Sequence, residues 1–557
     1  MRSWGGSGTV LGLAEEVYLP VSIRYNEAYG FLVQRRILLN KKYLYITVFF
    51  SGMTSLAVEL SASRLLGNVY GSSNLVWACI IGLILIYLTL GYWLGGKLAD
   101  KHPEPKVFYR LLMWASLTVG LVPMVARPLL RAASNAFDTL QIPLLVGAFI
   151  TVLILFIVPV TLIGMASPFA LKLALRDTEN AGKESGRLSA ISTLGSFVGT
   201  FLPVLVLIPW IGTFRTFLFF SSVLMLVATI GFLVTVDFKS WLRQAWMPVV
   251  LLLLWIFGAR GTDKASENMI YETESAYNYI QVLEYGPYRY LRLNEGQGFH
   301  SIYHPTELFY NGPWSQVLVA PFFNASPHGV DSVRSLAVVG LAAGTTARQA
   351  TAVFGSDLAI DGFEIDPKIV EVGQELFEMD EPNLNVIVED GRWGLTHSEK
   401  TYDVISVDAY RPPYIPWQMT TVEFFEAAHD HLTDQGVLVI NIGRSPLDRA
   451  LVNDLATTIR QVFPTVFAMD VPNSFNTILF ATRQPGSWDN LWENYALIAE
   501  DPDVDPLLLN AMTTTLMNMQ PEPEMTRVYT DDRTPIEWVT NKIVVDFILG
   551  GGIEDLQ

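Results

Sequence analysis

Long apolar stretches fill the first half of the chain, whereas the second half contains only short ones. A helix needs roughly 20 consecutive apolar residues to cross a bilayer core. Stretches of about that length lie near residues 43–62, 75–95, 108–126, 144–168, 188–211 and 214–236. A further stretch, 244–259, has about 16 residues, near the short limit of a spanning helix. The pattern predicts a multi-pass α-helical membrane domain of six or seven spans over residues 43–261.

The hydrophobic period changes at about residue 333. SLAVVGLA (335–342) is a near-continuous apolar run, typical of a parallel strand buried on both faces. Similar runs, separated mostly by stretches of helical character, follow at 358–366, 384–390, 402–408 and 436–442. This alternation predicts an α/β fold, a doubly wound sheet of the Rossmann-like methyltransferase type.

The remaining segments complete the domain organisation. Short alternating strands at 270–305 predict a small β-domain ahead of the sheet, and the chain after about residue 486 is mostly helical in pattern. The predicted divisions are an N-terminal cytoplasmic segment at 1–42, the transmembrane helical domain at 43–261, the small β-domain at 265–330, the α/β domain at 331–485 and a C-terminal helical tail at 486–557.

Charge divides the chain where hydropathy does. Residues 1–261 hold 21 Lys/Arg and 11 Asp/Glu, a formal +10, whereas residues 262–557 hold 16 and 43, a formal −27. The acidic second half repels nucleic acid, so no nucleic-acid partner is expected. Because Cys79 is the single cysteine, a disulfide framework and a thiolate metal cluster are excluded, and no metal is expected.

Basic residues give the orientation of the first span. Four of them precede it and predict a cytoplasmic N-terminus in the cell membrane: Arg35, Arg36, Lys41 and Lys42. Six spans would leave the second half in the cytoplasm, and seven would leave it outside. The sequence leaves this open.

Two features within the membrane half stand out. Glu59 and Arg64 lie in the first span, where charges are costly and often functional. They predict either a polar site inside the bundle, or an inward-packed Glu59 with Arg64 reaching the interface. Gly195 and Gly199 form a small-xxx-small pair, which allows close helix packing.

Candidate chemistry gathers where the predicted strands end. In open α/β sheets, ligands bind beyond the carboxyl ends of the strands. Three successive strands end in carboxylates there, and a glycine-containing turn follows the first strand. One acid would be a helix cap, but three converging acids predict a nucleoside-binding site. These positions are Gly340, Gly344, Glu364, Asp390 with Gly391, and Asp408.

The motifs around these positions resemble those of spermidine synthases. The similar segments are VVGLAAGTTA, GFEIDPKIVEVGQELF, VIVEDGRWGL, YDVISVDAYRPP and EFFEAAHDHLTDQGVLVINI. LRLNEGQGFHSIY (291–303) and TDDRTPIEW (530–538) look like segments of the membrane-fused members of that polyamine aminopropyltransferase family. The resemblance covers roughly residues 270–540 and fits the preceding membrane domain.

The resemblance implies aminopropyl transfer from decarboxylated S-adenosylmethionine to a polyamine. Glu364 would then hold the ribose, Asp390 with Gly391 would face the adenine, and Asp408 would lie beside the reacting sulfonium and amine. Carboxylates suit this chemistry because the donor and the acceptor are both cationic. An active enzyme would favour a cytoplasmic second half, where the donor is made.

Two acids of the family are missing here. Ala343 stands in the glycine loop where members have an acid, and Arg411 stands where they have the base for the attacking amine. A guanidinium cannot accept a proton at neutral pH and repels polyamines. Arg411 therefore predicts either a changed ligand, such as the carboxylate of S-adenosylmethionine itself, or a surface ion pair.

Other departures leave the activity open. The family's Tyr-His pair before the first strand is absent, and Trp314 and Ser315 stand near that place. Asp408 and Tyr410 are the remaining catalytic candidates. The leading hypothesis is a membrane-anchored transferase with a degenerate polyamine site. The alternatives are an inactive ligand-sensing or assembly subunit, and a transporter with a regulatory domain. A homo-oligomer or a membrane complex is left open.

Overall fold

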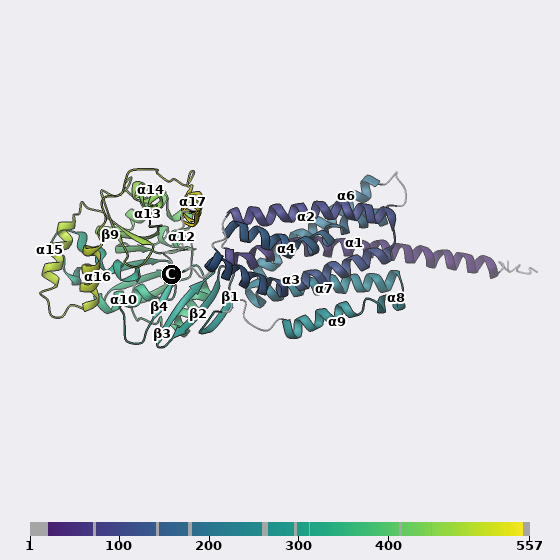
Figure 1. Cartoon of the computed structure of the whole chain (residues 1–557), viewed down its shortest axis with the longest axis horizontal. Coiled ribbons are helices and arrows are strands. Elements are labelled where there is room, and N and C mark those ends of the chain that lie inside the picture. The colour runs from purple at the N-terminus through teal and green to yellow at the C-terminus, as the bar shows by residue number, and fades with distance from the viewer. Residues whose placement is uncertain are drawn as a thin grey trace, which may run out of the picture.

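The computed structural model describes residues 21–70, 74–140, 144–175, 181–258, 266–294, 298–310, 312–410, 415–446 and 448–549. The protein is elongated, with a bundle of long helices at one end and a mixed α/β body at the other (Figure 1). We call these parts the helix bundle and the C-terminal half. The small antiparallel sheet lies between them, next to the bundle.

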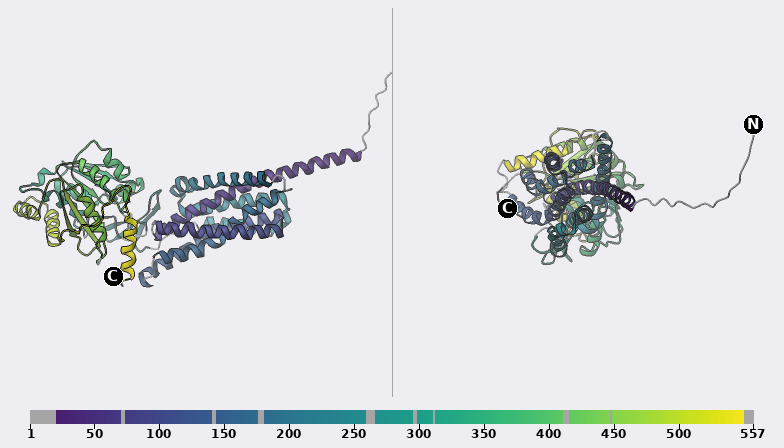
Figure 2. Two further views of the ribbon diagram at one scale, coloured as in Figure 1. Left: turned by 90° about the horizontal axis from the view of Figure 1, so that it is seen from above. Right: turned by 90° about the vertical axis from the view of Figure 1, so that its right-hand side faces the viewer.

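The bundle consists of long apolar helices linked by short connections. They are α1 (Val21–Tyr70), α2 (Asn74–Lys101), α3 (Pro105–Leu140), α4 (Leu144–Gly164), α5 (Ala166–Ala174), α6 (Ala181–Leu202), α7 (Ile208–Thr235), α8 (Phe238–Leu242) and α9 (Trp246–Leu253). Among the described residues, five helical segments are long and apolar enough to cross a membrane, which is compatible with membrane localisation. Residues 21–40 continue α1 as one helix beyond the bundle (Figure 2), and residues 1–20 of the predicted N-terminal segment lie outside the described residues.

The fifth apolar segment, Ala181–Thr235, runs along the bundle twice. A residue near each of its ends lies beside the start of the bundle part of α1: Lys41 Nζ donates to Glu184 Oε1 at 2.6 Å, and Tyr43 Oη donates to the Val227 carbonyl at 2.7 Å. The reversal lies at Gly212, whose φ of 78° interrupts the helix. The two predicted spans 188–211 and 214–236 fall on the two limbs.

Glycines allow two pairs of helices in the bundle to touch backbone to backbone. A Cβ at Gly195 or Gly199 of α6 would lie 2.0 or 2.1 Å from a carbonyl oxygen of α1, so no larger residue fits. Gly91 and Gly95 bring α2 equally close to α4 and Met165, with hypothetical Cβ contacts of 2.4 and 2.6 Å. The close packing predicted for Gly195 and Gly199 is present.

The small sheet has four antiparallel strands in the order β1-β2-β3-β4. They are β1 (Met269–Glu274), β2 (Tyr279–Tyr285), β3 (Tyr288–Leu293) and β4 (Ser301–Tyr303). Alternate residues of β2 and β3, such as Ile280, Val282 and Leu291, are buried against the helix that follows the second strand of the large sheet. This packing ties the small sheet to the α/β body.

The large sheet has seven strands in the order β10-β11-β9-β8-β5-β6-β7. They are β5 (Ser335–Val339), β6 (Ala359–Phe363), β7 (Leu384–Ile387), β8 (Tyr402–Val407), β9 (Leu432–Gly443), β10 (Thr465–Asp470) and β11 (Asn476–Thr482). The pairs from β7 across to β9 are parallel, and β11 and β10 form an antiparallel hairpin at the edge. The predicted doubly wound sheet behind a small β-domain is confirmed.

Helices cover both faces of this sheet. They are α10 (Thr345–Phe354), α11 (Pro367–Leu376), α12 (Gly391–Thr396), α13 (Val422–Asp430), α14 (Ala450–Ile459), α15 (Trp488–Ile498), α16 (Pro506–Met517) and α17 (Ile536–Leu549), with a 3₁₀ segment at Trp314–Phe323. Two separate apolar clusters form the cores on the two faces. The chain moves outward from β5 to β6 and β7, then returns to β8 on the other side of β5, so the switch point lies between β5 and β8.

Candidate functional site

The turn after β5 at the switch point has a left-handed backbone. Gly340 has φ 91°, Ala342 has φ 51° and Gly344 has φ 86°. A Cβ at Gly340 would lie 2.7 Å from the Ala409 backbone, and one at Gly344 would lie 2.6 Å from Met379 Cγ. Both glycines are therefore required by conformation and by space. The turn leads directly into the N-terminus of α10.

Glu364 follows β6 and lies against this turn. Its two carboxylate oxygens accept backbone N–H bonds from Ala342 and Asp366, each at 3.0 Å, and the residue is only 7% exposed. Burial raises the pKa of Glu364 to about 7, although the two backbone donors act in the opposite direction. The carboxyl group is thus held rigidly beside the glycine turn.

Asp390 and Gly391 end the segment after β7 and begin α12. Asp390 caps that helix by accepting from the Trp393 N–H at 3.0 Å. A Cβ at Gly391 would lie 2.5 Å from Val339 Cγ1, so only glycine fits there. The structure gives Asp390 a capping role, and its predicted contact with an adenine stays a prediction.

Asp408 follows β8 on the other side of the switch point. Its Oδ1 accepts from Asn441 Nδ2 of β9 at 2.9 Å. Burial raises the pKa of Asp408 to about 6, with the Asn441 bond working against the rise. Within the described part of the chain, the buried Oδ1 of Asn441 has no hydrogen-bond partner. Such an acceptor suits a ligand that brings a donor.

Asn441 was missed by the analysis of the sequence. It is a polar residue in the middle of GVLVINI, where all neighbours are apolar or Gly. A polar side chain in a strand buried on both faces needs a hydrogen-bond partner. A single asparagine within this apolar run could therefore have identified Asn441 as a candidate site residue. Its partner, Asp408, lies 33 residues away in the chain.

Tyr410 lies beside the end of β9. Its hydroxyl accepts a hydrogen bond from the Gly443 N–H, and burial raises the pKa of the phenol. A tyrosine that is protonated and engaged with backbone is a poor proton acceptor at neutral pH. The geometry therefore favours Tyr410 as a residue that positions the Asp408 loop. Arg411 lies outside the described residues.

Ala343 lies in an apolar environment. It is 3% exposed, its N–H donates to Ser301 Oγ at 2.9 Å, and its methyl belongs to the cluster formed by the small sheet and α11. Trp314 and Ser315 are also buried, at the start of the 3₁₀ segment. None of the three places a charge in the site.

A chain of hydrogen bonds leads from Glu364 to the bundle. Asp366, which is fully buried, accepts from Ser275 Oγ at 2.5 Å and from Asn278 Nδ2 at 2.9 Å in the β1–β2 turn. Arg64 at the end of α1 donates to the Ser275 and Tyr277 carbonyls of the same turn, at 2.7 and 2.9 Å.

A second contact reinforces the first. The Thr213 N–H and hydroxyl, just after the Gly212 break, donate to the Glu274 carboxylate of β1 at 2.5 and 3.0 Å. The bundle therefore holds β1 and its turn from two helices. We call these contacts the α1–β1 clamp: Arg64, Thr213, Glu274 and Ser275.

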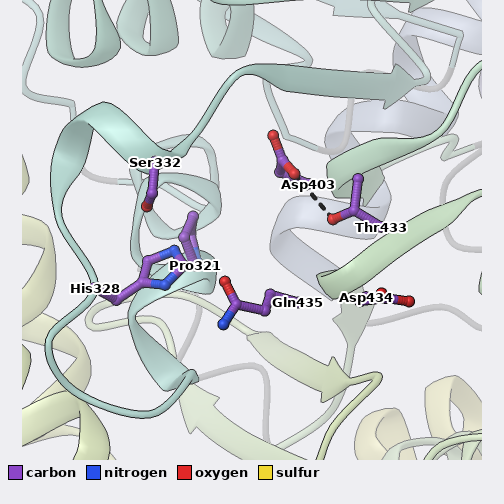
Figure 3. Close-up of a pocket in the computed structure, with 7 residues that line it drawn as sticks. All are labelled: Pro321, His328, Ser332, Asp403, Thr433, Asp434 and Gln435. Carbon is purple, nitrogen blue, oxygen red and sulfur yellow. Dashed lines mark hydrogen bonds between the residues drawn. The ribbon is translucent and has the colours of Figure 1, made fainter.

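The C-terminal half also has a cavity of about 280 Å³ at the opposite edge of the sheet. Figure 3 shows Asp403 and Thr433 on one side of it and His328 and Ser332 on the other. Asp403 accepts from the Arg334 and Ser335 N–H groups and from Thr433, which holds the amino ends of β5 and β9 together. Because this edge is not where α/β sheets bind ligands, the cavity is not assigned to the site.

The comparison with protein families finds a match over the residues that form the large sheet. Residues 336–483 match the family described as spermine/spermidine synthase domain. A probable polyamine aminopropyl transferase of Bifidobacterium longum is 36% identical over 224 residues, which is 40% of this chain and 48% of that protein. A polyamine aminopropyltransferase of Clostridium beijerinckii is 30% identical over 144 residues, 24% of this chain and 50% of that protein.

The chain spans about half the length of these curated relatives. Among solved structures, a probable spermidine synthase from Corynebacterium glutamicum aligns with 46% of this chain and 95% of its own, at 17% identity and a TM-score of 0.36.

Proposed function

We propose, because residues 336–483 match the family described as spermine/spermidine synthase domain, that the protein is a membrane-anchored, spermidine synthase-like transferase. It uses an S-adenosylmethionine-type donor and has a degenerate polyamine site. The observation that carries the proposal is the pair of carboxyls on the two sides of the switch point, Glu364, which is buried, and Asp408, which is partly buried, both with a raised pKa. The helix bundle anchors the protein in the membrane.

The residues present fit such a donor. The Glu364 carboxylate would accept from ribose hydroxyls, and the turn at Gly340 and Gly344 would let the backbone approach the nucleoside. Asp408 and the free acceptor of Asn441 would face its cationic end. A sulfonium donor supplies an electrophilic carbon, in either its carboxylated or its decarboxylated form.

The acceptor side of the site fits a polyamine less well. Arg411 stands where the family has the base for the attacking amine, and Tyr410 is engaged with the Gly443 N–H. Asp408, with a pKa of about 6, is ionised at pH 7.5 and is the proton acceptor that the described residues provide. Because a guanidinium replaces the family's base and repels a polyamine, turnover of putrescine should still be very slow or absent.

A second candidate, a ligand-sensing subunit, is favoured by the α1–β1 clamp. The Ser275 Oγ bond to Asp366 and the Asp366 N–H bond to Glu364 connect the nucleoside position to the bundle. A catalytic domain that only needed an anchor would have no use for such a connection. Both candidates require the same nucleoside site, and turnover distinguishes them.

The test uses the full-length protein in detergent. Calorimetric titration with S-adenosylmethionine, its decarboxylated form or methylthioadenosine should give binding. Glu364→Ala should weaken it roughly ten- to hundredfold, the scale of about 1.5–3 kcal/mol for a hydrogen bond to a charged group. The matched control is Glu371→Ala, an exposed glutamate paired with Lys368 on α11, which should bind like the wild type.

Heat from none of the three ligands would refute the nucleoside site. If binding is present, mass spectrometry with putrescine and decarboxylated donor measures aminopropyl transfer. Ordinary enzymatic turnover would contradict the degenerate polyamine site and support an intact transferase. Binding without any transfer, across a panel of amine and acidic acceptors, would support the sensing function.

A further inference from the structure

A small cavity lies inside the helix bundle, apart from the site at the switch point. Its volume is about 100 Å³, and it is lined by α1, α2, α6 and the junction of α4 with α5. Serine hydroxyls come from three of these elements. Ser51 and Ser55 belong to α1, Ser192 and Ser196 to α6, and Ser167 to α5.

Hydroxyls inside apolar helices normally donate back to their own helix. Thr47 and Thr54 of α1 and Thr200 of α6 each donate to the carbonyl four residues earlier, at 2.8–2.9 Å. In the described part of the chain, Ser51 and Ser55 from the same helix make no hydrogen bond. Ser51 is nevertheless only 6% exposed.

Ser192, on the opposite wall, is likewise without a hydrogen bond among the described residues, and Ser196 donates to the Gly52 carbonyl at 3.2 Å. An unsatisfied hydroxyl in an apolar interior costs on the order of 1–3 kcal/mol. The buried Ser51, with the partly buried Ser55 and Ser192 lining the same cavity, therefore points to an occupant with which these hydroxyls interact.

The helix break on the third wall adds another oxygen. Pro168 has no N–H to donate to the carbonyl of Gly164, four residues earlier, and α4 ends at that glycine. Gly164 lines the cavity. Interrupted helices whose freed carbonyls face a cavity are a recurrent way of binding cations within membranes.

A carboxylate lies one turn along α1. Glu59 is four residues after Ser55, so the two side chains lie on the same face of the helix. Among the described residues, none forms a hydrogen bond or an ion pair with Glu59, which is partly buried. An intramembrane carboxylate without a counter-charge favours a cationic occupant.

We propose that this cavity is a binding site for a small monovalent metal cation of the size of sodium. Ser51, Ser55, Ser192 and Gly164, which line the cavity, would supply its oxygen ligands, and Glu59, one turn along α1 and outside the lining, would balance its charge. About 100 Å³ holds a few atoms, whereas sites for drug-sized molecules occupy roughly 300–1,000 Å³. The small size favours a monatomic ion over a nucleoside at this position. The proposal is independent of the transferase function.

The test measures sodium binding to the purified full-length protein in detergent. Radioactive ²²Na⁺ should bind saturably, and the unfolding temperature should rise with NaCl but not with choline chloride at equal ionic strength. Ser51→Ala and Ser192→Ala should each raise the half-saturating sodium concentration about tenfold, and the double variant should raise it further. Glu59→Gln should also weaken binding.

Ser63→Ala is the matched control, because this α1 serine donates to the Leu60 carbonyl and does not line the cavity. It should bind sodium like the wild type. If water alone occupies the cavity, the NaCl and choline curves will coincide and the proposal fails. It also fails if sodium binds but the cavity variants and Ser63→Ala behave alike. Because calorimetry of nucleoside binding is a separate measurement, failure here leaves the proposed function untouched.

Discussion

At the scale of single residues, the site keeps two carboxyl groups where burial opposes their charge. The pKa is raised to about 7 for Glu364 and to about 6 for Asp408, in both cases mainly by burial. Strongly raised values of this kind cluster at functional sites, because holding an acid where burial opposes its charge costs stability. The consequence is a stability that depends on pH.

Asp408→Asn tests this consequence. The native pKa of about 6 exceeds the unfolded value of about 3.9, so the native state holds the proton more tightly. Stability should therefore fall as the pH rises from about 4 to 6 and level off above that. Asparagine removes this loss and can still accept from Asn441. At pH 8 the variant should be more stable than the wild type by on the order of 2 kcal/mol, with little gain at pH 4.

Thermal unfolding of the full-length protein across this pH range measures the difference. A variant that is less stable than the wild type at pH 8 would show that the ionised carboxyl stabilises the fold, contrary to the prediction. Asp448→Asn, at a partly exposed aspartate in the segment after β9, is the control and should show no gain that grows with pH.

At the scale of elements, the hydrophobic pattern was sufficient for the strands of the large sheet and for the small β-domain. The predicted and observed elements differ at their ends. The predicted strand 384–390 ends at Ile387, because the chain then turns to cap α12 with Asp390. The stretch 423–433, EFFEAAHDHLT, has a helical pattern in the sequence, but α13 ends at Asp430 because β9 already begins at Leu432.

The sequence pattern did not predict which elements that lie far apart in the chain contact each other. The missing acid at Ala343 was recognised, but its burial against the small sheet was not, because that sheet packs on α11 through residues about 80 positions apart. In the α1–β1 clamp, the two hydrogen bonds of Arg64 connect residues that are separated by 211 and 213 positions in the chain. Hydrophobic periodicity cannot predict contacts over such separations. The ends of the predicted strands pointed to the candidate glycines and carboxylates, whereas the structure added Asn441.

The clamp gives a prediction at this scale. Arg64→Met removes the charged donor from the Ser275 and Tyr277 carbonyls and loosens the turn that holds Asp366 beside Glu364. Binding of the S-adenosylmethionine-type ligand should weaken about three- to tenfold, a fraction of the 1.5–3 kcal/mol of a charged hydrogen bond. Hydrogen exchange in the turn should speed up. The distant, exposed Arg110→Met should change neither.

Calorimetry and exchange together decide the question. Unchanged affinity with faster exchange in Arg64→Met would mean that the clamp only docks the two halves. That outcome would remove the observation that favours a ligand-sensing function.

At the scale of the whole molecule, the number of passes decides on which side the C-terminal half lies. In the described chain, α1, α2, α3, α4 with α5, the two limbs of Ala181–Thr235, and α9 run in alternation along the bundle. The last is short, but it follows α3 for its length: Trp246 packs on Trp114, and Arg127 reaches the Gly258 carbonyl. This odd number of passes leaves the start of the bundle and the C-terminal half at opposite ends (Figure 2).

Basic residues are distributed unequally between these ends. The end of the bundle near the C-terminal half has Arg64, Arg127, Arg131 and Arg215 among its described residues. The far end has Lys41, Lys42, Lys97, Lys101, Lys106, Arg110, Lys172, Lys183, Arg187, Lys239 and Arg243. Since short basic loops stay in the cytoplasm, the far end is expected to be cytoplasmic and the C-terminal half to lie outside.

Cysteine labelling of intact cells tests this orientation. In a Cys79→Ser background, a cysteine replacing the exposed Asp501 of the C-terminal half should react with a membrane-impermeant maleimide, and one replacing the exposed Lys101 should react only after the membrane is opened. An outside C-terminal half would be separated from a donor made in the cytosol, which would favour ligand sensing over transfer. The reverse labelling pattern would place the site in the cytoplasm, and the basic residues at the far end of the bundle would then require another explanation.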